Sequence, residues 1–291
     1  MTVQEALRLY PRLPHLDREV LLSSVLDQNR VFLLTHAENK LTPAQAKRYR
    51  DFLARALKHE PIAYIVGQKE FYGHDFSVGP GVLIPRPETE LTVERAIDHI
   101  TSSEALRKKI AVVDVGTGSG AIIESIFLSI QKEARKNISW FAVDSEDAPL
   151  RYARNNAKRF EIGSGIRFVK SDLLSRLLKK LSDHDEILVV ANLPYLSDML
   201  YYRTAPNVKQ YEPKSALLSG RDGLDHYRRL MTELRTINMA GIKITFFLEI
   251  SPEQAKRILP LFADIATLSS LEIVPDLAGK SRLVIGTIEK Q

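Results

Sequence analysis

The sequence predicts an α/β fold in which a small helical domain precedes a mostly parallel β-sheet. Two observations indicate this class. From residue 110 onward, short apolar runs alternate with helical patterns, which is typical of a parallel sheet covered by helices on both faces. Residues 1–68, in contrast, carry only helical patterns.

Within residues 1–68 the clearest helix start is at Thr42. Threonine stands in the N-cap position, proline follows at the first helical position, and Gln45 completes a capping box. Apolar residues then recur at three- and four-residue spacing and predict one buried stripe, formed by Tyr49, Phe52, Leu53, Ala56 and Leu57. An upstream helix is predicted around Leu21 and Val25.

A connector is predicted over residues 69–90. Two apolar-aromatic runs flank Gly73-His74-Asp75, which indicates a β-hairpin with a three-residue loop. Pro85-Arg86-Pro87 then favours a stiff, extended segment, because each proline fixes its own φ and restrains the preceding residue. We therefore expect three parts: a helical domain over 1–68, a connector over 69–90 and a sheet domain over 91–291.

The pattern of the larger domain places its elements as follows. Strands are expected at Ile110–Val115, Ser139–Asp144, Ile166–Lys170, Glu186–Asn192, Ile242–Ile250 and Arg282–Ile288. Helices are expected at Glu88–Ile100, Ala121–Lys136, Ala148–Phe160, Gly223–Ile237 and Pro252–Phe262.

Composition limits the classes of function. Hydrophobic residues make up 44% and charged residues 26% of the chain, as in soluble globular proteins. The absence of cysteine excludes disulfides, thiolate nucleophiles and cysteine-rich zinc sites. The sequence contains no signal peptide and no apolar run of the roughly twenty residues that span a bilayer, so we expect a cytoplasmic protein without a membrane partner. The net charge of +5 permits an anionic partner without requiring one.

A glycine-rich turn follows the first strand of the sheet domain. In "VVDVGTGSGAIIESI", Gly116, Gly118 and Gly120 allow positive φ and let backbone amides approach a ligand at a helix start. Asp144 ends the next strand and could accept hydrogen bonds from both hydroxyls of a ribose. No Gly-Lys-Ser/Thr follows the glycines, which excludes a kinase-style phosphate loop. NAD and S-adenosylmethionine both remain possible.

Further polar residues follow the next two strands. Asp172, in "FVKSDLL", could accept from an adenine amine, or it could cap a helix beginning at Leu173. Asn192, in "ANLPYLSD", could merely start a turn. However, the carboxyl ends of parallel strands meet at one edge of the sheet, where ligands bind. We therefore expect Asn192 to face the cofactor.

The Asn-x-Pro-Tyr segment suits methylation of a planar NH₂ group. Such a nitrogen is a weak nucleophile because its lone pair is delocalised. The Asn192 side-chain oxygen and the Leu193 carbonyl could accept its two hydrogens and orient the lone pair, while Tyr195 stacks on the flat group. No strong base is needed before transfer, because the alkylated nitrogen loses its proton readily. We expect no metal.

The sequence resembles the HemK-type release-factor glutamine methyltransferases over nearly its whole length. The most specific stretch is "EFYGHDFSVGPGVLIPRPETE", residues 70 to 90, which is similar to that family's interdomain connector. Further similar segments occur in the family's order: "DVGTGSGAI", "AVDSEDAPLRYARNNA", "SDLL", "NLPY", "YEPKSALLSGRDGLDHYRRL", "FLEISPEQ" and "DLAGKSRLVI".

The resemblance implies a seven-stranded, Rossmann-like class I methyltransferase sheet and an N-terminal domain that helps dock the substrate. It also implies methyl transfer from S-adenosylmethionine to the glutamine amide in the Gly-Gly-Gln loop of bacterial peptide chain release factors, with S-adenosylhomocysteine as product. A monomer is expected. The residues implied to bind the cofactor are Gly116, Thr117, Gly118, Ser119, Gly120, Asp144, Asp172, Leu173 and Asn192. Those implied to bind or act on the glutamine are Asn192, Leu193, Pro194 and Tyr195; Arg86, Glu88 and Thr89 border the site without assigned roles.

The chain departs from the family pattern at two positions. Leu193 stands where proline is more common, which removes some rigidity and adds an N–H that needs a partner. His59 stands where glycine is common and affects only a local turn.

Two other functions compete with this prediction. One is methylation of the exocyclic amine of adenine in nucleic acid, although no dense basic stripe with interleaved aromatic residues is present. The other is a cofactor-binding scaffold without catalysis.

Overall fold

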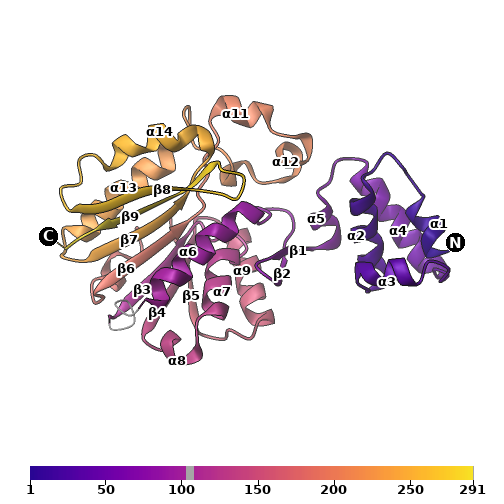
Figure 1. Ribbon diagram of the computed structural model, residues 1–291, viewed down its shortest axis with the longest axis horizontal. Helices are drawn as coiled ribbons and strands as arrows, with labels where there is room; N and C mark the ends of the chain where they lie inside the picture. The colour runs from indigo at the N-terminus through magenta and orange to yellow at the C-terminus, as the bar shows by residue number, and fades with distance from the viewer. Residues whose placement is uncertain (103–107, 291) are drawn as a thin grey trace.

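The N-terminal helices form a compact group beside the sheet-bearing part of the chain. The computed structural model describes residues 1–102 and 108–290, and Figure 1 shows this group set apart from the sheet and joined to it through α5 and a hairpin. The helices are α1 (Val3–Leu7), α2 (His15–Leu26), α3 (Arg30–Thr35), α4 (Pro43–Ala56) and α5 (Ile62–Val66). Their shared core includes the fully buried Leu21, Tyr49 and Leu53. The group thus has a hydrophobic core of its own.

Helix α4 begins as the sequence predicts and ends slightly earlier. The Gln45 amide donates to Thr42 Oγ1 at 3.2 Å, and the Thr42 amide donates to Gln45 Oε1 at 2.9 Å, which completes the capping box. The prediction that Leu57 belongs to the buried stripe is wrong: its side chain is 39% exposed, because the helix ends at Ala56 and the chain turns away. In that turn His59 adopts φ +64°, a conformation that favours glycine.

The hairpin of the connector has a shorter loop than predicted. Strands β1 (Gln68–Phe71) and β2 (His74–Ser77) pair with Phe71 opposite His74, so only Tyr72 and Gly73 form the loop. Both loop residues have positive φ, 50° and 75°, as a type I′ turn requires. The predicted three-residue loop is therefore wrong, because the primed turn matches the strand twist and lets pairing begin at His74.

Seven strands form one sheet within the described residues, in the order β5-β4-β3-β6-β7-β9-β8. All neighbouring pairs from β5 to β7 are parallel, and β9 is antiparallel to both of its neighbours. The strands are β3 (Ile110–Val115), β4 (Ile138–Asp144), β5 (Ile166–Lys170), β6 (Glu186–Ala191), β7 (Lys243–Glu249), β8 (Leu268–Pro275) and β9 (Ser281–Ile288). The predicted mostly parallel, seven-stranded α/β sheet is confirmed.

Helices cover the sheet on both faces. They are α6 (Glu90–Thr101), α7 (Ala121–Ser129), α8 (Lys132–Arg135), α9 (Asp147–Arg159), α10 (Leu178–Leu181), α11 (Asp198–Arg203), α12 (Pro206–Tyr211), α13 (Asp225–Asn238) and α14 (Ala255–Ile258). Single 3-10 turns are η1 (Pro87–Thr89), η3 (Lys214–Ala216), η4 (Pro252–Gln254) and η5 (Leu259–Phe262). None of the helices in the described ranges has the length and apolar character that crossing a bilayer requires.

Two predicted helices and one strand need correction. The helix predicted over 121–136 ends at Ser129, because Ile130 is extended and buries its side chain before the short α8. The helix predicted over 252–262 divides into η4, α14 and η5, and Pro260, which lacks an N–H, prevents a continuous helix. Strand β8 has no predicted counterpart, because most of its residues are partly exposed and lack a clear apolar pattern.

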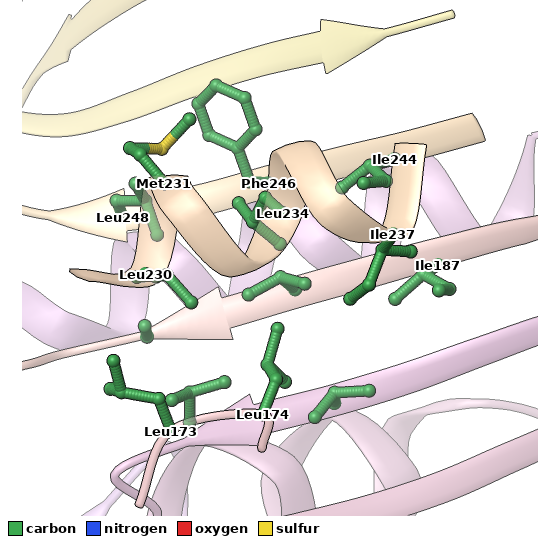
Figure 2. Packing of buried hydrophobic residues seen from close by; sticks show 14 of the residues in the cluster. Leu173, Leu174, Ile187, Leu230, Met231, Leu234, Ile237, Ile244, Phe246 and Leu248 are labelled. Atoms are coloured by element: carbon green, nitrogen blue, oxygen red, sulfur yellow. The ribbon is translucent and has the colours of Figure 1, made fainter. Parts of the chain in front are cut away.

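Helix α13 shows how the sheet is covered. Figure 2 shows Leu230, Leu234 and Ile237 of this helix pointing toward the neighbouring strands β6 and β7, where Ile187 and Phe246 lie. All five side chains are at most 4% exposed. Burying a side chain of this size contributes about 1.5–3 kcal/mol relative to exposure, so this face holds α13 firmly on the sheet.

Glu186, the first residue of β6, links helix α6 to the sheet. Its buried carboxylate bonds to His99 Nε2 at 2.8 Å and accepts from Thr245 Oγ1 at 2.7 Å. Burial by itself would raise the pKa of Glu186, but the hydrogen bonds with His99 and Thr245 outweigh it and lower the pKa to about 2. The ionised carboxylate therefore stabilises the fold.

We expect Glu186→Gln to cost stability in a pH-dependent way. The ordinary pKa is 4.5, so the stabilisation is present above about pH 4.5 and disappears as the pH falls toward 2. The loss at neutral pH should reach at most about 3 kcal/mol, from the size of the shift. Urea unfolding followed by fluorescence of Trp140, the one tryptophan, measures it between pH 7 and 3. The exposed Glu272→Gln is the control. The prediction would be contradicted if Glu186→Gln and the unsubstituted protein differed in unfolding free energy by the same amount at every pH.

Candidate active site

The site lies at the carboxyl edge of the sheet, where the strand order reverses. Strand β3 pairs in parallel register with β4 on one side and β6 on the other, with Val115 opposite both Val143 and Ala191. The segments that follow these three strands therefore emerge side by side. Ligands of open α/β sheets bind in the crevice at such a reversal.

A cavity occupies this crevice. It encloses about 990 Å³ of space between the atoms, its open mouth included. The sequence-predicted residues that line it are Gly116, Thr117, Gly118, Ser119, Asp144, Asp172, Leu173, Asn192, Leu193 and Pro194, and Thr89 joins them from the connector. Gly120 and Tyr195 do not line it.

The glycine loop has the conformation that its sequence requires. Gly116, Gly118 and Gly120 have φ of 75°, 59° and 85°. A Cβ at Gly120 would lie 2.1 Å from Glu124 Oε1, so this position also lacks space for a side chain. Gly120 is the N-cap of α7, so the loop presents backbone amides and a helix start to the cavity.

Two buried acids lie beneath the loop. Thr117 Oγ1 donates to Asp114 Oδ2 at 2.7 Å, and burial raises the pKa of Asp114 to about 7. Burial, with a smaller contribution from Asp114, raises the pKa of Glu124 to about 10. Glu124 is therefore a neutral carboxylic acid at pH 7, and it adds no negative charge below the cavity.

Asp144 retains capacity to accept hydrogen bonds from a ligand. Its Oδ2 accepts from the Gly118 amide at 3.1 Å, and its Oδ1 accepts from the Glu146 amide at 3.0 Å. Each carboxylate oxygen has a second lone pair. Burial raises the pKa of Asp144, while the amides of Glu146 and Gly118 lower it. The two amides fix the carboxylate beside the loop.

Asp172 does not cap a helix. The next helix in the chain is α10, whose N-cap is Leu177, and Leu173 adopts φ +50°, outside helical conformation. The helix-cap alternative is therefore wrong. Asp172 instead accepts from Arg229 Nη2 at 2.5 Å at the rim of the cavity. Its predicted contact with an adenine amine stays a prediction.

The Asn192 side chain is held by a residue far away in the sequence. Its Nδ2 donates to Thr89 Oγ1 at 3.0 Å. The additional N–H of Leu193 has a partner, since it donates to the buried Tyr227 hydroxyl. Tyr195 packs against the main core cluster, and burial raises its pKa to about 12. Its predicted stacking role is untested.

Several cavity walls were not predicted from the sequence. They are Gly81, Leu83 and Pro85 of the connector; Ala121, Ile122, Ser145, Glu146, Pro149 and Ser171 near the glycine loop and the acids; and Pro213, Ser215, Ala216 and His226 between β6 and α13. The buried Glu212 links the connector to the segment between β6 and α13. It accepts from the Ile84 amide at 3.1 Å and from Arg86 Nη2 at 2.5 Å. The only sequence signal for them was the similarity of their segments to a family pattern.

Asn156 connects the hairpin to the glycine loop. It is fully buried on α9, accepts from the Ser77 amide at 2.8 Å, and donates to the carbonyls of Ser77 and Ser119 at 3.1 and 2.9 Å. One side chain thus satisfies three backbone groups from two segments. The connector and the loop are therefore positioned together.

The fold and the site define the class of protein. A seven-stranded sheet with a reversed last strand, a glycine loop after its central strand and an acid after the next is the class I methyltransferase arrangement. The catalytic domain of hMettl16, in complex with a MAT2A 3′UTR hairpin, shares this fold with a TM-score of 0.55 and 13% identity, covering 86% of this chain and 83% of that one.

Sequence comparisons identify the family. Residues 6–67 match the family profile described as the PrmC N-terminal domain. The release factor glutamine methyltransferase of Bacillus cereus is 36% identical over 93% of this chain and 92% of its own length. The release factor glutamine methyltransferase of Nitratidesulfovibrio vulgaris is 33% identical over 93% of this chain and 87% of its own length. The solved release factor-specific protein-(glutamine-N5) methyltransferase of Alicyclobacillus acidocaldarius is 27% identical, covering 74% of this chain and 99% of that one, with a TM-score of 0.42. The chain belongs to the release factor glutamine methyltransferase family.

We expect Asn156→Ala to weaken both stability and cofactor binding. The substitution leaves the buried Ser119 carbonyl without this partner, at about 1–3 kcal/mol, and removes two part-buried hydrogen bonds to Ser77. Urea unfolding and calorimetric titration with S-adenosylhomocysteine measure the two effects. The exposed neighbour Asn155→Ala is the matched control. Equal behaviour of the two variants would show that Asn156 does not connect hairpin and loop.

Proposed function

We propose that this chain transfers a methyl group from S-adenosylmethionine to the side-chain amide nitrogen of the glutamine in the Gly-Gly-Gln loop of peptide chain release factors. Family membership supports this activity. The observation that carries the assignment of the site is the placement of Asn192, Leu193 and Pro194 in the same cavity as the glycine loop and Asp144.

The residues of the cavity fit the cofactor. A Cβ at Gly116 would press on Leu193 Cδ2 at 3.2 Å, so a side chain at this position would crowd the wall of the cavity. Asp144 offers fixed acceptors for ribose hydroxyls, and the start of α7 suits electron-rich groups. When bound, S-adenosylmethionine supplies an electrophilic methyl carbon on a positively charged sulfur. Within the described residues no cluster of three or more metal-ligating side chains occurs.

The chemistry left to the protein is positioning. The Thr89 hydroxyl accepts a hydrogen bond from the Asn192 NH₂. The Asn192 oxygen is therefore available to accept from the substrate NH₂. The Leu193 carbonyl accepts the second hydrogen. These two acceptors direct the nitrogen lone pair toward the methyl carbon and stabilise the positive charge that develops on nitrogen. The N–C bond forms as the S–C bond breaks, and the nitrogen then releases one proton to water.

Residues 1–68 are proposed to help dock the release factor. The Tyr211 hydroxyl of α12 donates to the Lys58 carbonyl at 2.9 Å, so the segment that walls the cavity also contacts the N-terminal helices. The domain division at 68 and 90, the monomeric state and a cytoplasmic location remain predictions.

The competing substrate is the exocyclic amine of adenine in nucleic acid. The likeness to an RNA-bound catalytic domain concerns the fold alone. Incubation with labelled S-adenosylmethionine and either purified, unmethylated release factor or nucleic acid distinguishes the two. We expect label in the release factor, and mass spectrometry of its tryptic peptides should place one methyl group on the Gly-Gly-Gln glutamine. Label only in nucleic acid would overturn the proposal.

We expect Asn192→Ala to lower kcat by about two to three orders of magnitude, the loss typical of one polar group that stabilises a transition state. Cofactor affinity should change much less, because the glycine loop and Asp144 are intact. Single-turnover methylation at saturating cofactor measures the rate. The exposed Asn137→Ala serves as the control, and an unaltered rate in Asn192→Ala would remove Asn192 from the mechanism.

A further inference from the structure

A buried carboxylate lies behind the asparagine without a described role. Glu249 is the last residue of β7, its side chain is 1% exposed, and its Oε2 has no hydrogen-bond partner among the described residues. The nearest cations are engaged elsewhere: Arg86 pairs with Glu212 at 2.5 Å, and Arg282 pairs with Asp276 at 3.2 Å. The hydrogen bond to this carboxylate comes from Thr89.

Thr89 is the link between Glu249 and Asn192. It is 3% exposed and stands at the N-cap position of α6, yet its side chain makes no capping hydrogen bond. Its hydroxyl instead contacts Glu249 on one side and accepts from Asn192 Nδ2 on the other. Thr89 stands in the ordinary position for a helix cap, yet it bonds to two side chains from elsewhere: Asn192, which follows β6, and Glu249, which ends β7.

The direction of these hydrogen bonds follows from the donors available. An ionised carboxylate can only accept, and a hydroxyl has one proton. When Glu249 is ionised, Thr89 therefore gives its proton to Glu249, and its oxygen accepts from Asn192. The Asn192 amide is consequently held with its NH₂ toward Thr89 and its oxygen on the opposite side of the planar group.

We propose that Glu249 and Thr89 form a positioning pair that fixes the orientation of the Asn192 amide, so that its oxygen and not its NH₂ meets the methyl acceptor. This inference rests on the proposed function, because it concerns how the substrate NH₂ is recognised. If the Asn192 amide were inverted, its NH₂ would face the NH₂ of the substrate. The lone pair of the substrate nitrogen would then have no acceptor to orient it. The pair acts through Asn192.

The first test removes the hydroxyl while keeping the side-chain shape. Thr89→Val should lower kcat about a hundredfold, as expected for a misoriented catalytic group. The KM for the release factor and the affinity for S-adenosylhomocysteine should change little, and Thr89→Ser should retain most of the rate. Thr92→Val, a buried threonine one turn along α6, is the matched control.

A double variant separates positioning from a general structural role. If Thr89 acts only through Asn192, adding Thr89→Val to Asn192→Ala lowers kcat no further. A further hundredfold loss in the double variant would overturn the proposal.

The pH profile tests Glu249. Burial raises its pKa to about 7, against the lowering effect of the Thr89 hydrogen bond. Protonated Glu249 can donate to the Thr89 hydroxyl. The Thr89 proton then points to Asn192, whose amide turns its oxygen in place of its NH₂ toward Thr89. We expect kcat at saturating cofactor to fall as the pH drops through about 7, and Glu249→Gln, which does not ionise, to lose this dependence. The other charged or titratable groups facing Glu249 are Arg86, Glu88, Tyr195, Tyr227 and Arg282.

A measurement without substrate distinguishes failure of this inference from failure of the proposed function. In nitrogen-15 NMR spectra of the enzyme with S-adenosylhomocysteine, the Asn192 side-chain NH₂ should be protected from exchange and should titrate with Glu249. Both properties should disappear in Thr89→Val. An unprotected Asn192 NH₂ in the unsubstituted protein would overturn the positioning pair. An unsubstituted protein that methylates no release factor, with its Asn192 NH₂ protected, would count against the proposed function alone.

Discussion

The parallel register of β3 with β6 is the constraint on which the site depends. Because Val115 lies opposite Ala191, the glycine loop and the Asn192 segment leave the sheet at the same level on adjacent strands. Strand β4, on the other side of β3, adds Asp144 at the same edge. A one-residue shift of either pair would turn the buried side chains of a strand to the other face, so the core that fixes this register also fixes the site.

Polar contacts hold the connector against the cavity at the edge of the sheet. Asn156 fastens the hairpin to the glycine loop, and Glu212 fastens Ile84 and Arg86 to the segment after β6. These contacts join residues 37 to 128 positions apart in the sequence. The cavity is therefore closed by buried polar side chains that bond to backbone groups, with one ion pair between Arg86 and Glu212.

Much of this could be predicted from local pattern. The strands β3, β4, β5 and β6 are apolar runs bounded by turn residues, and a glycine loop with an acid after the next strand is readable as a ligand site. The misassigned segments are those where tertiary contacts override local preference: Ile130 is extended because the core takes its side chain, and Leu57 is exposed because the chain turns at His59. Strand β8 pairs with β9 yet carries too little apolar pattern to be recognised.

The sequence by itself determined the class of fold and most of its elements, because apolar periodicity and glycine-proline positions are local properties, and the resemblance of its motifs indicated the family. It also marked Asn192 and Asp144 as candidate site residues. Only the tertiary structure decided which groups surround them. Thr89 and Glu249 lie 103 residues before and 57 residues after Asn192. No periodicity or spacing connects positions so far apart, and their proximity follows from the packing of α6 and β7 around β6.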